Sequence, residues 1–311
     1  MPRLGVLGTL VLDTIHSPGA DGDALTDWGG IAYSLAALEA AAPIGWDVFP
    51  LIKVGADLRQ GADEFLDELG RVDSLDGVLT VPEPNNRVDL YYSSLPRRCE
   101  KLTGGVPGWT WSELARSAST CDALIVNFIA GWEIDLETAG HLRSEYAGLV
   151  YADIHSLLLA VGPAGVRSLR PLPEWPEWRR CFDVVQMNEE ELSTLTETGG
   201  DPADEARDSV LHGPETLFVT HGAAGSRWYV RAAGRVREGE VPTETVATGA
   251  FDPTGCGDVW GAACTSSLLS GEDAAGAAER ANRLAGLAAR HRGTKGLAAA
   301  LQSAAGPGGL K

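Results

Sequence analysis

Apolar residues occur along the chain in short continuous runs that alternate with stretches of helical spacing. Runs at 123–127, 148–153, 183–187 and 216–220 each end in, or lead directly to, a polar or glycine position. Continuous runs of this length are typical of inner parallel strands that helices cover on both faces. The carboxyl ends of such strands meet at one edge of the sheet, where α/β folds bind ligands. The pattern therefore predicts a ligand-binding rim that includes Asn127, Asp153, Asn188, His221 and Gly222.

The remaining segments complete an α/β chain. A buried strand interrupted by glycine is predicted over 4–12, and an Ala/Leu-rich helix over 31–41 follows Gly29 and Gly30. Short alternating segments at 78–80 and 87–93 fit a small sheet apart from the main one. Because no internal repeat or long polar linker divides the chain, we expect a single domain over 1–311 with a disordered tail over 303–311. Further predicted elements are a strand over 48–54 and helices over 61–70, 111–117 and 281–290.

The run Asp-Pro-Thr-Gly-Cys-Gly-Asp over 252–258 carries the most chemical information. Gly255 and Gly257 let backbone N–H groups converge, Cys256 adds its own N–H, and a helix expected to begin near Asp258 adds unpaired amides. A carboxylate at this helix start can accept a hydroxyl proton while the amides hold the charge of a transferring phosphoryl group. The same letters also fit a glycine-rich loop that only caps a helix.

A second motif follows the strand over 183–187. Asn188 and Glu191 are three residues apart at the start of a predicted helix, so they share one helical face. That spacing suits an amide and a carboxylate that meet one phosphate–metal cluster. The alternative is an asparagine N-cap followed by acidic residues that suit the helix dipole.

Together, the 252–258 run, the Gly29-Gly30 helix start and Asn188-x-x-Glu191 resemble the ribokinase-like (PfkB) carbohydrate kinase family. The resemblance extends over about residues 4–297. It implies an α/β fold with a central, mostly parallel sheet between helices and a small β lid built from segments near 14–18 and 78–98. It also implies an ATP-dependent kinase that phosphorylates a hydroxyl of a sugar or sugar derivative.

The resemblance assigns a role to each matching position. Asp258 would be the general base, the amides of Gly255, Cys256 and Gly257 would stabilise the transferring group, and Glu191 would hold Mg²⁺ through water. Asp252 marks a monovalent cation site of the family, for K⁺, which the sequence neither shows nor excludes. Expected nucleotide contacts are Asn188, Thr220, Gly222, Gly225, Thr254 and Asn282, and expected acceptor contacts are Asp13, Gly29, Gly30, Tyr33, Asn127 and Asp153.

The chain departs from the sugar kinases at Tyr33. Family members commonly carry a substrate-binding asparagine there, and an aromatic ring suggests an acceptor pocket that stacks on a base or an apolar group. A nucleoside kinase of the same fold is therefore an alternative to a sugar kinase. His155 lies just past a strand end, where a structural hydrogen-bonding role is the commoner one.

Composition narrows the classes of partner and compartment. The 311 residues carry a formal charge of −18, which argues against nucleic acid or an anionic membrane surface as partner. Five cysteines without a C-x-x-C pair fit a reducing compartment, and the N-terminus enters a strand pattern directly. With no apolar run of about 18 residues, a cytoplasmic protein is expected. The family resemblance adds a possible homodimer through the lid.

Two alternatives come from other classes. A catalytically silent ligand-binding or regulatory protein could share the fold, although Asp258, Asn188 and Glu191 are all retained. A dinucleotide oxidoreductase has little support, because Gly5-Val6-Leu7-Gly8 lacks the G-x-G-x-x-G spacing. The sequence leaves open the acceptor, the position phosphorylated and the oligomeric state.

Overall fold

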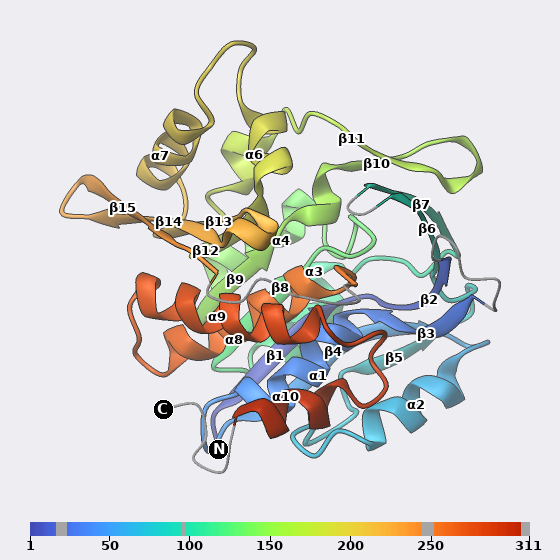
Figure 1. The fold of residues 1–311 in the computed structure, drawn as a ribbon. Coiled ribbons are helices and arrows are strands. Elements are labelled where there is room, and N and C mark those ends of the chain that lie inside the picture. The colour runs from blue at the N-terminus through green and yellow to red at the C-terminus, as the bar shows by residue number, and fades with distance from the viewer. Residues whose placement is uncertain (17–23, 95–96, 244–251, 306–311) are drawn as a thin grey trace.

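A nine-stranded sheet forms the centre of the molecule, with strand order β15-β14-β13-β12-β9-β8-β1-β4-β5. The computed structural model describes residues 1–16, 24–94, 97–243 and 252–305 (Figure 1). The pairs from β5 to β13 are parallel, and β14 and β15 add an antiparallel edge. The strands are β1 (Arg3–Gly8), β4 (Asp47–Gly55), β5 (Val78–Val81), β8 (Ala123–Asn127), β9 (Leu149–Asp153), β12 (Val184–Asn188), β13 (Thr216–Thr220), β14 (Ser226–Ala232) and β15 (Arg235–Val241).

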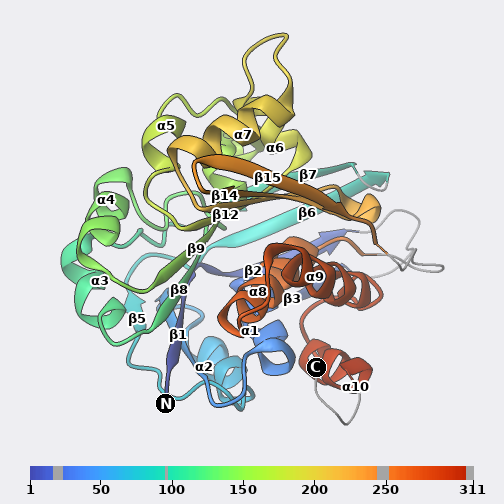
Figure 2. The same cartoon turned by 90° about the vertical axis from the view of Figure 1, so that its left-hand side faces the viewer.

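Helices cover both faces of this sheet. Successive residues of β8 point to opposite sides, so Ile125 packs into one hydrophobic cluster and Leu124 into the other. Figure 2 shows α1, α8 and α9 on one side of the sheet and α3, α4 and α5 on the other. The helices are α1 (Ile31–Ala41), α2 (Arg59–Asp67), α3 (Trp111–Ala118), α4 (Leu136–Glu145), α5 (Trp175–Trp178), α6 (Glu189–Leu195), α7 (Pro202–His212), α8 (Cys256–Leu269), α9 (Ala274–Ala288) and α10 (Leu297–Ala305). The predicted α/β architecture is confirmed.

A second, four-stranded sheet forms the lid. Its order is β3-β2-β6-β7, from β2 (Leu10–His16), β3 (Leu25–Gly30), β6 (Arg87–Ser94) and β7 (Arg97–Thr103). Val11, Ile15, Val88 and Leu90 form a small apolar core on its inner face with Leu102 and Ala130. A short hairpin of β10 (Leu159–Val161) and β11 (Arg167–Leu169) lies close to the end of β7 (Figure 1).

Several predicted boundaries need correction. The single strand expected over 4–12 is two strands, because the chain leaves the main sheet after β1 and enters the lid as β2. The segment expected at 78–80 in the small sheet is β5, which pairs with β4 at the edge of the main sheet. Residues 303–305, expected in a disordered tail, end helix α10, while 17–18 of the predicted lid and 306–311 of the predicted tail lie outside the described residues. In the part of the chain that is described, no helix has the length and apolarity to cross a bilayer.

Candidate active site

One cavity of about 370 Å³ lies between the lid, the carboxyl ends of the parallel strands and helices α8 and α9. It brings together almost every site residue that the sequence predicts, from segments far apart in the chain. Gly29, Asp252 and His221, the last predicted as part of the rim, are the predicted residues outside its lining. Those that line it are Asp13, Gly30, Tyr33, Asn127, Asp153, Asn188, Glu191, Thr220, Gly222, Gly225, Thr254, Gly255, Cys256, Gly257, Asp258 and Asn282.

Asp258 lies in the first turn of α8, with its carboxylate held from the end of β8. Asn127 Nδ2 donates to Asp258 Oδ1 over 2.7 Å. Ser34 Oγ, on α1, donates to the backbone carbonyl oxygen of Asp258 over 3.2 Å. Asn127, which is 2% exposed, therefore fixes the carboxylate, and Ser34, which is 1% exposed, fixes the backbone of the turn. Asp258 itself lines the cavity.

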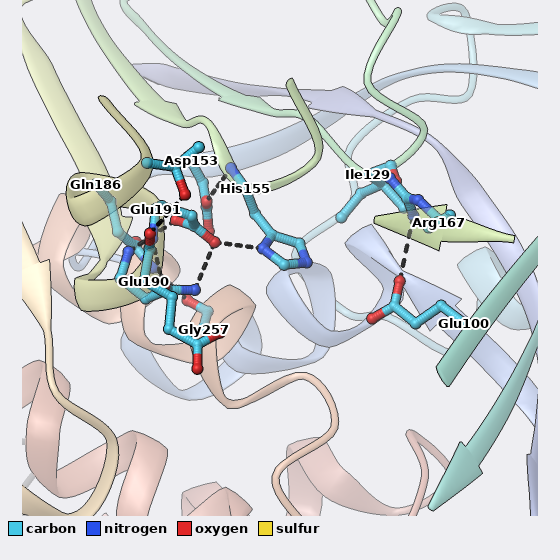
Figure 3. Close-up of polar contacts among 11 residues, drawn as sticks. Glu100, Ile129, Asp153, His155, Arg167, Gln186, Glu190, Glu191 and Gly257 are labelled. Carbon is cyan, nitrogen blue, oxygen red and sulfur yellow. Dashed lines mark hydrogen bonds and ion pairs between the residues drawn. The ribbon is translucent and has the colours of Figure 1, made fainter. Parts of the chain in front are cut away.

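The glycine-rich run forms the turn that leads into α8. Gly255 is the N-cap and has a left-handed backbone conformation, with φ of 75°. The ring of Tyr33 packs directly on it, since a Cβ at Gly255 would lie 2.2 Å from Tyr33 Cγ and Cδ1. Gln186 Nε2 donates to the carbonyl oxygen of Gly257 over 3.1 Å and ties the first turn to β12 (Figure 3). Gly255, Cys256 and Gly257 therefore line the cavity from a loop that is fixed on both sides.

Asp252 anchors the start of the same run. Its Oδ1 accepts from the Thr254 N–H over 2.9 Å, and its own N–H donates to the carbonyl oxygen of Ala289 at the end of α9 over 3.0 Å. Cys256 Sγ donates to the carbonyl oxygens of Asp252 and Ala285, at 3.7 Å in each case. The Cys256 side chain thus fastens the loop to α9, and its backbone N–H donates to the Pro253 carbonyl oxygen over 3.2 Å, so the expected role of this N–H in the cradle is not supported.

Asn188 and Glu191 form a reciprocal capping box at the start of α6. Asn188 Oδ1 accepts from the Glu191 N–H over 2.9 Å, and Glu191 Oε2 accepts from the Asn188 N–H over 2.7 Å. Glu191 Oε1 also lies 2.5 Å from His155 Nδ1 (Figure 3). Glu191 is 1% exposed yet lines the cavity. The capping interpretation of this motif is therefore confirmed, and it leaves the carboxylate on the cavity wall next to a histidine.

The donor end of the cavity has a floor of small residues. Ala285, Gly286 and Ala289 on α9 line it, and a Cβ at Gly286 would meet nothing within 4 Å. Asn282 is part of the wall, because Trp260 Nε1 donates to its Oδ1 over 2.8 Å and its Nδ2 donates to the Val241 carbonyl oxygen over 2.9 Å. Both ends of this amide are already engaged. At Gly286 the space over this floor is open.

The lid end of the cavity, which is the expected acceptor end, combines Asp13 with apolar walls. Asp13, on β2, is 4% exposed and lines the cavity. Gly29 on β3 makes room for it, because a Cβ there would lie 1.8 Å from Asp13 Oδ2. Tyr33 is only 3% exposed, and burial and the nearby carboxylates, Asp13 first among them, raise the pKa of its hydroxyl. With one ring face on Gly255, Tyr33 leaves little surface for the stacking that the sequence suggested.

Comparison with known proteins agrees with this geometry. The model of the pfkB family carbohydrate kinases matches residues 165–299. A pyrophosphate-dependent kinase in the ribokinase family, complexed with a pyrophosphate analogue and myo-inositol, superposes with a TM-score of 0.73 at 17% identity over 93% of this chain and 96% of that chain. The chain has the ribokinase-like fold. The resemblance to the PfkB family seen in the sequence is confirmed.

Two other solved structures show how broad this ribokinase-like group is. The nucleoside kinase of Burkholderia thailandensis in complex with inosine has a TM-score of 0.74 at 17% identity, over 97% of both chains. The ribokinase of Thermotoga maritima has a TM-score of 0.71 at 18% identity, over 97% of this chain and 99% of that chain. A search of curated proteins found no match. At these identities the neighbours establish the fold, and the activity has to be argued from the site.

Within the ribokinase-like fold, sequence reasoning missed four residues that line or support the cavity. Gln186 lies two positions before the end of β12, so the sequence pattern places it inside a buried strand. Trp260 fits the pattern of a core residue on a helix. Glu100 and Arg167 belong to β7 and β11, which no pattern predicted. Only Gln186 had a usable signal, since a polar residue inside an apolar run needs a partner.

Asp153 should make the stability of the protein depend on pH. Burial, and then the charges of Asp258 and Glu191, raise its pKa from 3.8 to about 7. The folded state therefore retains a proton that the unfolded state loses, and stability falls by about 1.4 kcal/mol per pH unit at most as pH rises between these values. We expect Asp153→Asn to become more stable than the wild type by up to a few kcal/mol across this window, with no further change above it.

Urea unfolding at several pH values, with a chelator present, measures this difference. Asp135→Asn is the control with the opposite sign. Hydrogen bonds from the Thr138 N–H and hydroxyl lower the pKa of Asp135, so its contribution is lost as pH falls through the folded pKa. A difference between Asp153→Asn and wild type that stays constant with pH would contradict the raised pKa.

Proposed function

We propose that the protein is an ATP-dependent kinase that phosphorylates a hydroxyl group of a sugar or sugar derivative, with Asp258 as general base. The observation that carries this proposal is the position of Asp258. Its carboxylate is oriented by Asn127 at 2.7 Å, in the first turn of α8, inside the cavity that joins Asp13 to Asn188. A base, an anion-binding helix start and sites for two substrates thus share one enclosed space.

The proposed reaction assigns one task to each part of the cavity. The acceptor hydroxyl transfers its proton to the Asp258 carboxylate as its oxygen attacks the terminal phosphorus of ATP, and the bond from that phosphorus to the bridging oxygen breaks so that ADP leaves. The backbone N–H groups of Gly255 and Gly257 stabilise the negative charge on the transferring phosphoryl group, while the Cys256 N–H donates to Pro253. Gly257 leaves room for it, since the nearest atom to a Cβ there would be Gln186 Nε2 at 3.7 Å. The lid excludes water, which would otherwise compete as acceptor.

The residues near Glu191 fit Mg²⁺ held through water. Among the described residues no group of three or more His, Cys, Asp or Glu side chains is arranged to ligate a metal directly. The negative charges of Asp258 and Glu191 both raise the pKa of Asp153, so a cation bound beside these carboxylates would relieve their repulsion. Glu191 would hold the ion through its waters, with Asn188 fixing the carboxylate. Bound there, Mg²⁺ would neutralise charge on the donor phosphates.

Three further expectations stay predictions. The small-residue floor at Ala285, Gly286 and Ala289 supports a purine nucleotide as donor. A requirement for K⁺ at Asp252 is testable by replacing K⁺ with Na⁺ in the assay. Dimerisation through the lid is testable by light scattering.

A nucleoside kinase is the second candidate. The acceptor end has apolar walls from Val88, Leu90 and Ile129, which suit the face of a base as well as the apolar face of a sugar ring. The solved nucleoside kinase in complex with inosine shares the fold. Tyr33 supports this candidate less than the sequence suggested, because its ring packs on Gly255.

The test is release of ADP from Mg-ATP across a panel of free sugars, polyols and nucleosides. We expect one acceptor class to raise the rate of ADP release well above background. Pyrophosphate is included as a second donor, because one structural neighbour is a pyrophosphate-dependent kinase. Failure to bind nucleotide in the presence of Mg²⁺, together with no turnover on any compound, would favour a catalytically silent protein on this fold.

A further inference from the structure

An ion pair closes the acceptor end of the cavity, at a distance from the Asp258 end. Glu100 on lid strand β7 faces Arg167 on β11, with Glu100 Oε2 3.6 Å from Arg167 Nη1 (Figure 3). Their side chains are only 12% and 4% exposed, and both line the cavity. Figure 3 shows the pair on the opposite side of His155 from Glu191 and Asp153. Charged side chains are seldom this buried without a role in packing or recognition.

The guanidinium of Arg167 is held on a rigid loop. Its Nη1 donates to the Ile129 carbonyl oxygen over 3.0 Å, and its Nη2 to that of Ala130 over 3.5 Å. The carboxylate of Glu133, itself 2% exposed, accepts the N–H groups of Ile129, Ala130 and Gly131 at 2.5–2.9 Å. The pair is therefore fixed before any ligand arrives, as a recognition element should be.

Charge along the cavity disfavours an anionic acceptor. Among the described lining residues, the carboxylates of Asp13, Glu100, Asp153, Glu191 and Asp258 outnumber the basic side chains of Arg167 and His155. Each of these two basic side chains already faces a carboxylate, Glu100 or Glu191. A phosphate monoester carries a charge of about −1.5 to −2 near neutral pH and would be repelled by this lining.

The apolar walls of the cavity suit a ring. Val11, Val88, Leu90 and Ile129 line the cavity and can cover an apolar ring face. In the same cavity, Glu100 offers acceptor oxygens and Arg167 offers N–H donors side by side. Hydroxyl groups, or the donor and acceptor edge of a base, satisfy both partners without adding charge.

We propose that the acceptor is an uncharged hydroxylated ring compound, and that Glu100 and Arg167 recognise the end of it that lies away from Asp258. The inference rests on the proposed kinase function and adds the acceptor class. The negative charge of Glu100 offsets the positive charge of Arg167, so that the guanidinium cannot serve as a phosphate site. Removing the Glu100 charge should therefore admit phosphorylated compounds.

The experiment compares matched pairs of acceptors. Ribose, myo-inositol and inosine are each assayed with Mg-ATP beside a monophosphate of the same compound, and binding is followed by calorimetry. The proteins are wild type, Glu100→Gln and Asp89→Asn. Asp89 is the control because it is a half-buried carboxylate on neighbouring strand β6 that does not line the cavity.

For the wild type we expect kcat/KM of the neutral compound to be about 100-fold or more higher than kcat/KM of its monophosphate. A difference of this size corresponds to the repulsion of one charged group from a lining of like charge. Glu100→Gln should raise KM for the neutral compound about tenfold with a smaller change in kcat, which corresponds to one lost hydrogen bond to a charged group. The same variant should lower KM for the monophosphate, which a merely structural role would not do. Asp89→Asn should match wild type.

The outcomes separate this inference from the kinase proposal. A wild type that prefers a monophosphate, with ADP release that depends on Asp258, overturns the neutral acceptor and leaves the kinase standing. A Glu100→Gln enzyme that behaves like Asp89→Asn removes Glu100 from recognition. If Glu100→Gln does not fold, the wild-type preference alone decides the acceptor class. A wild type that neither binds nor phosphorylates any neutral compound also overturns the inference, and nucleotide binding then tests the kinase proposal.

Discussion

Replacement of Asp258 by asparagine is expected to lower kcat by roughly 10²–10⁴-fold, the usual contribution of a positioned general base. Asparagine has nearly the same shape, so it keeps its place in the first turn of α8 but cannot accept the hydroxyl proton. Affinity for Mg-ATP should change by only about threefold, because the backbone amides of the turn remain. Single-turnover rates and nucleotide titrations of both proteins give these two quantities.

Asp273→Asn is the matched control for this variant. Asp273 also begins a helix, as N-cap of α9, where its Oδ1 accepts from the Gly276 N–H over 3.0 Å. It does not line the cavity, so its replacement should leave kcat unchanged. Asn127→Ala should cause an intermediate loss, because it removes the 2.7 Å hydrogen bond that orients the Asp258 carboxylate. Retention of most of kcat by Asp258→Asn would remove Asp258 as the base.

The sequence predicted those parts of the fold whose signals are local. A strand that ends in a polar residue, such as Asn127, can be recognised from a few neighbouring positions. The same is true of glycines at a fixed spacing before a helix. The boundary between β1 and β2 has no such signal, because the apolar pattern continues through the point where the chain passes from one sheet to the other. The antiparallel strands β14 and β15 were missed because neither alternates: the large apolar residues of β14 are consecutive at 228–230, and β15 has only Val236 and Val241 in a polar stretch.

The site residues that the sequence could not predict depend on contacts between distant segments. Glu100 and Arg167 are ordinary surface residues in the sequence, and only the packing of β11 against β7 makes them a buried pair. Asn282 was predicted as a nucleotide contact, but Trp260 and Val241 engage its amide. Tyr33 was predicted to face a substrate, and its ring face meets Gly255. In each case the partner decides the role, and the sequence does not name the partner.

The contact between Tyr33 and Gly255 leads to the second large effect. Gly255→Ala is expected to lower the free energy of unfolding by about 2–5 kcal/mol and to abolish turnover. A left-handed backbone conformation costs a residue with a Cβ about 1 kcal/mol or more, and φ of Gly255 is 75°. The added methyl would also lie 2.2 Å from Tyr33 Cγ, so the ring or the loop must move, which costs about 1–3 kcal/mol more. Urea unfolding and the ADP-release assay measure both consequences.

Gly257→Ala is the control that isolates the cause. It adds the same methyl group two residues later, where the nearest atoms would be Gln186 Nε2 at 3.7 Å and Asp153 Oδ2 at 4.0 Å. Gly257 lies within α8 and has no positive φ, so alanine there should leave stability unchanged or raise it by up to about 1 kcal/mol through helix propensity. Equal losses of stability in the two variants would mean that the loop does not tolerate any side chain. A loss confined to Gly255→Ala would locate the constraint at position 255, where a left-handed backbone and the contact with Tyr33 both require glycine.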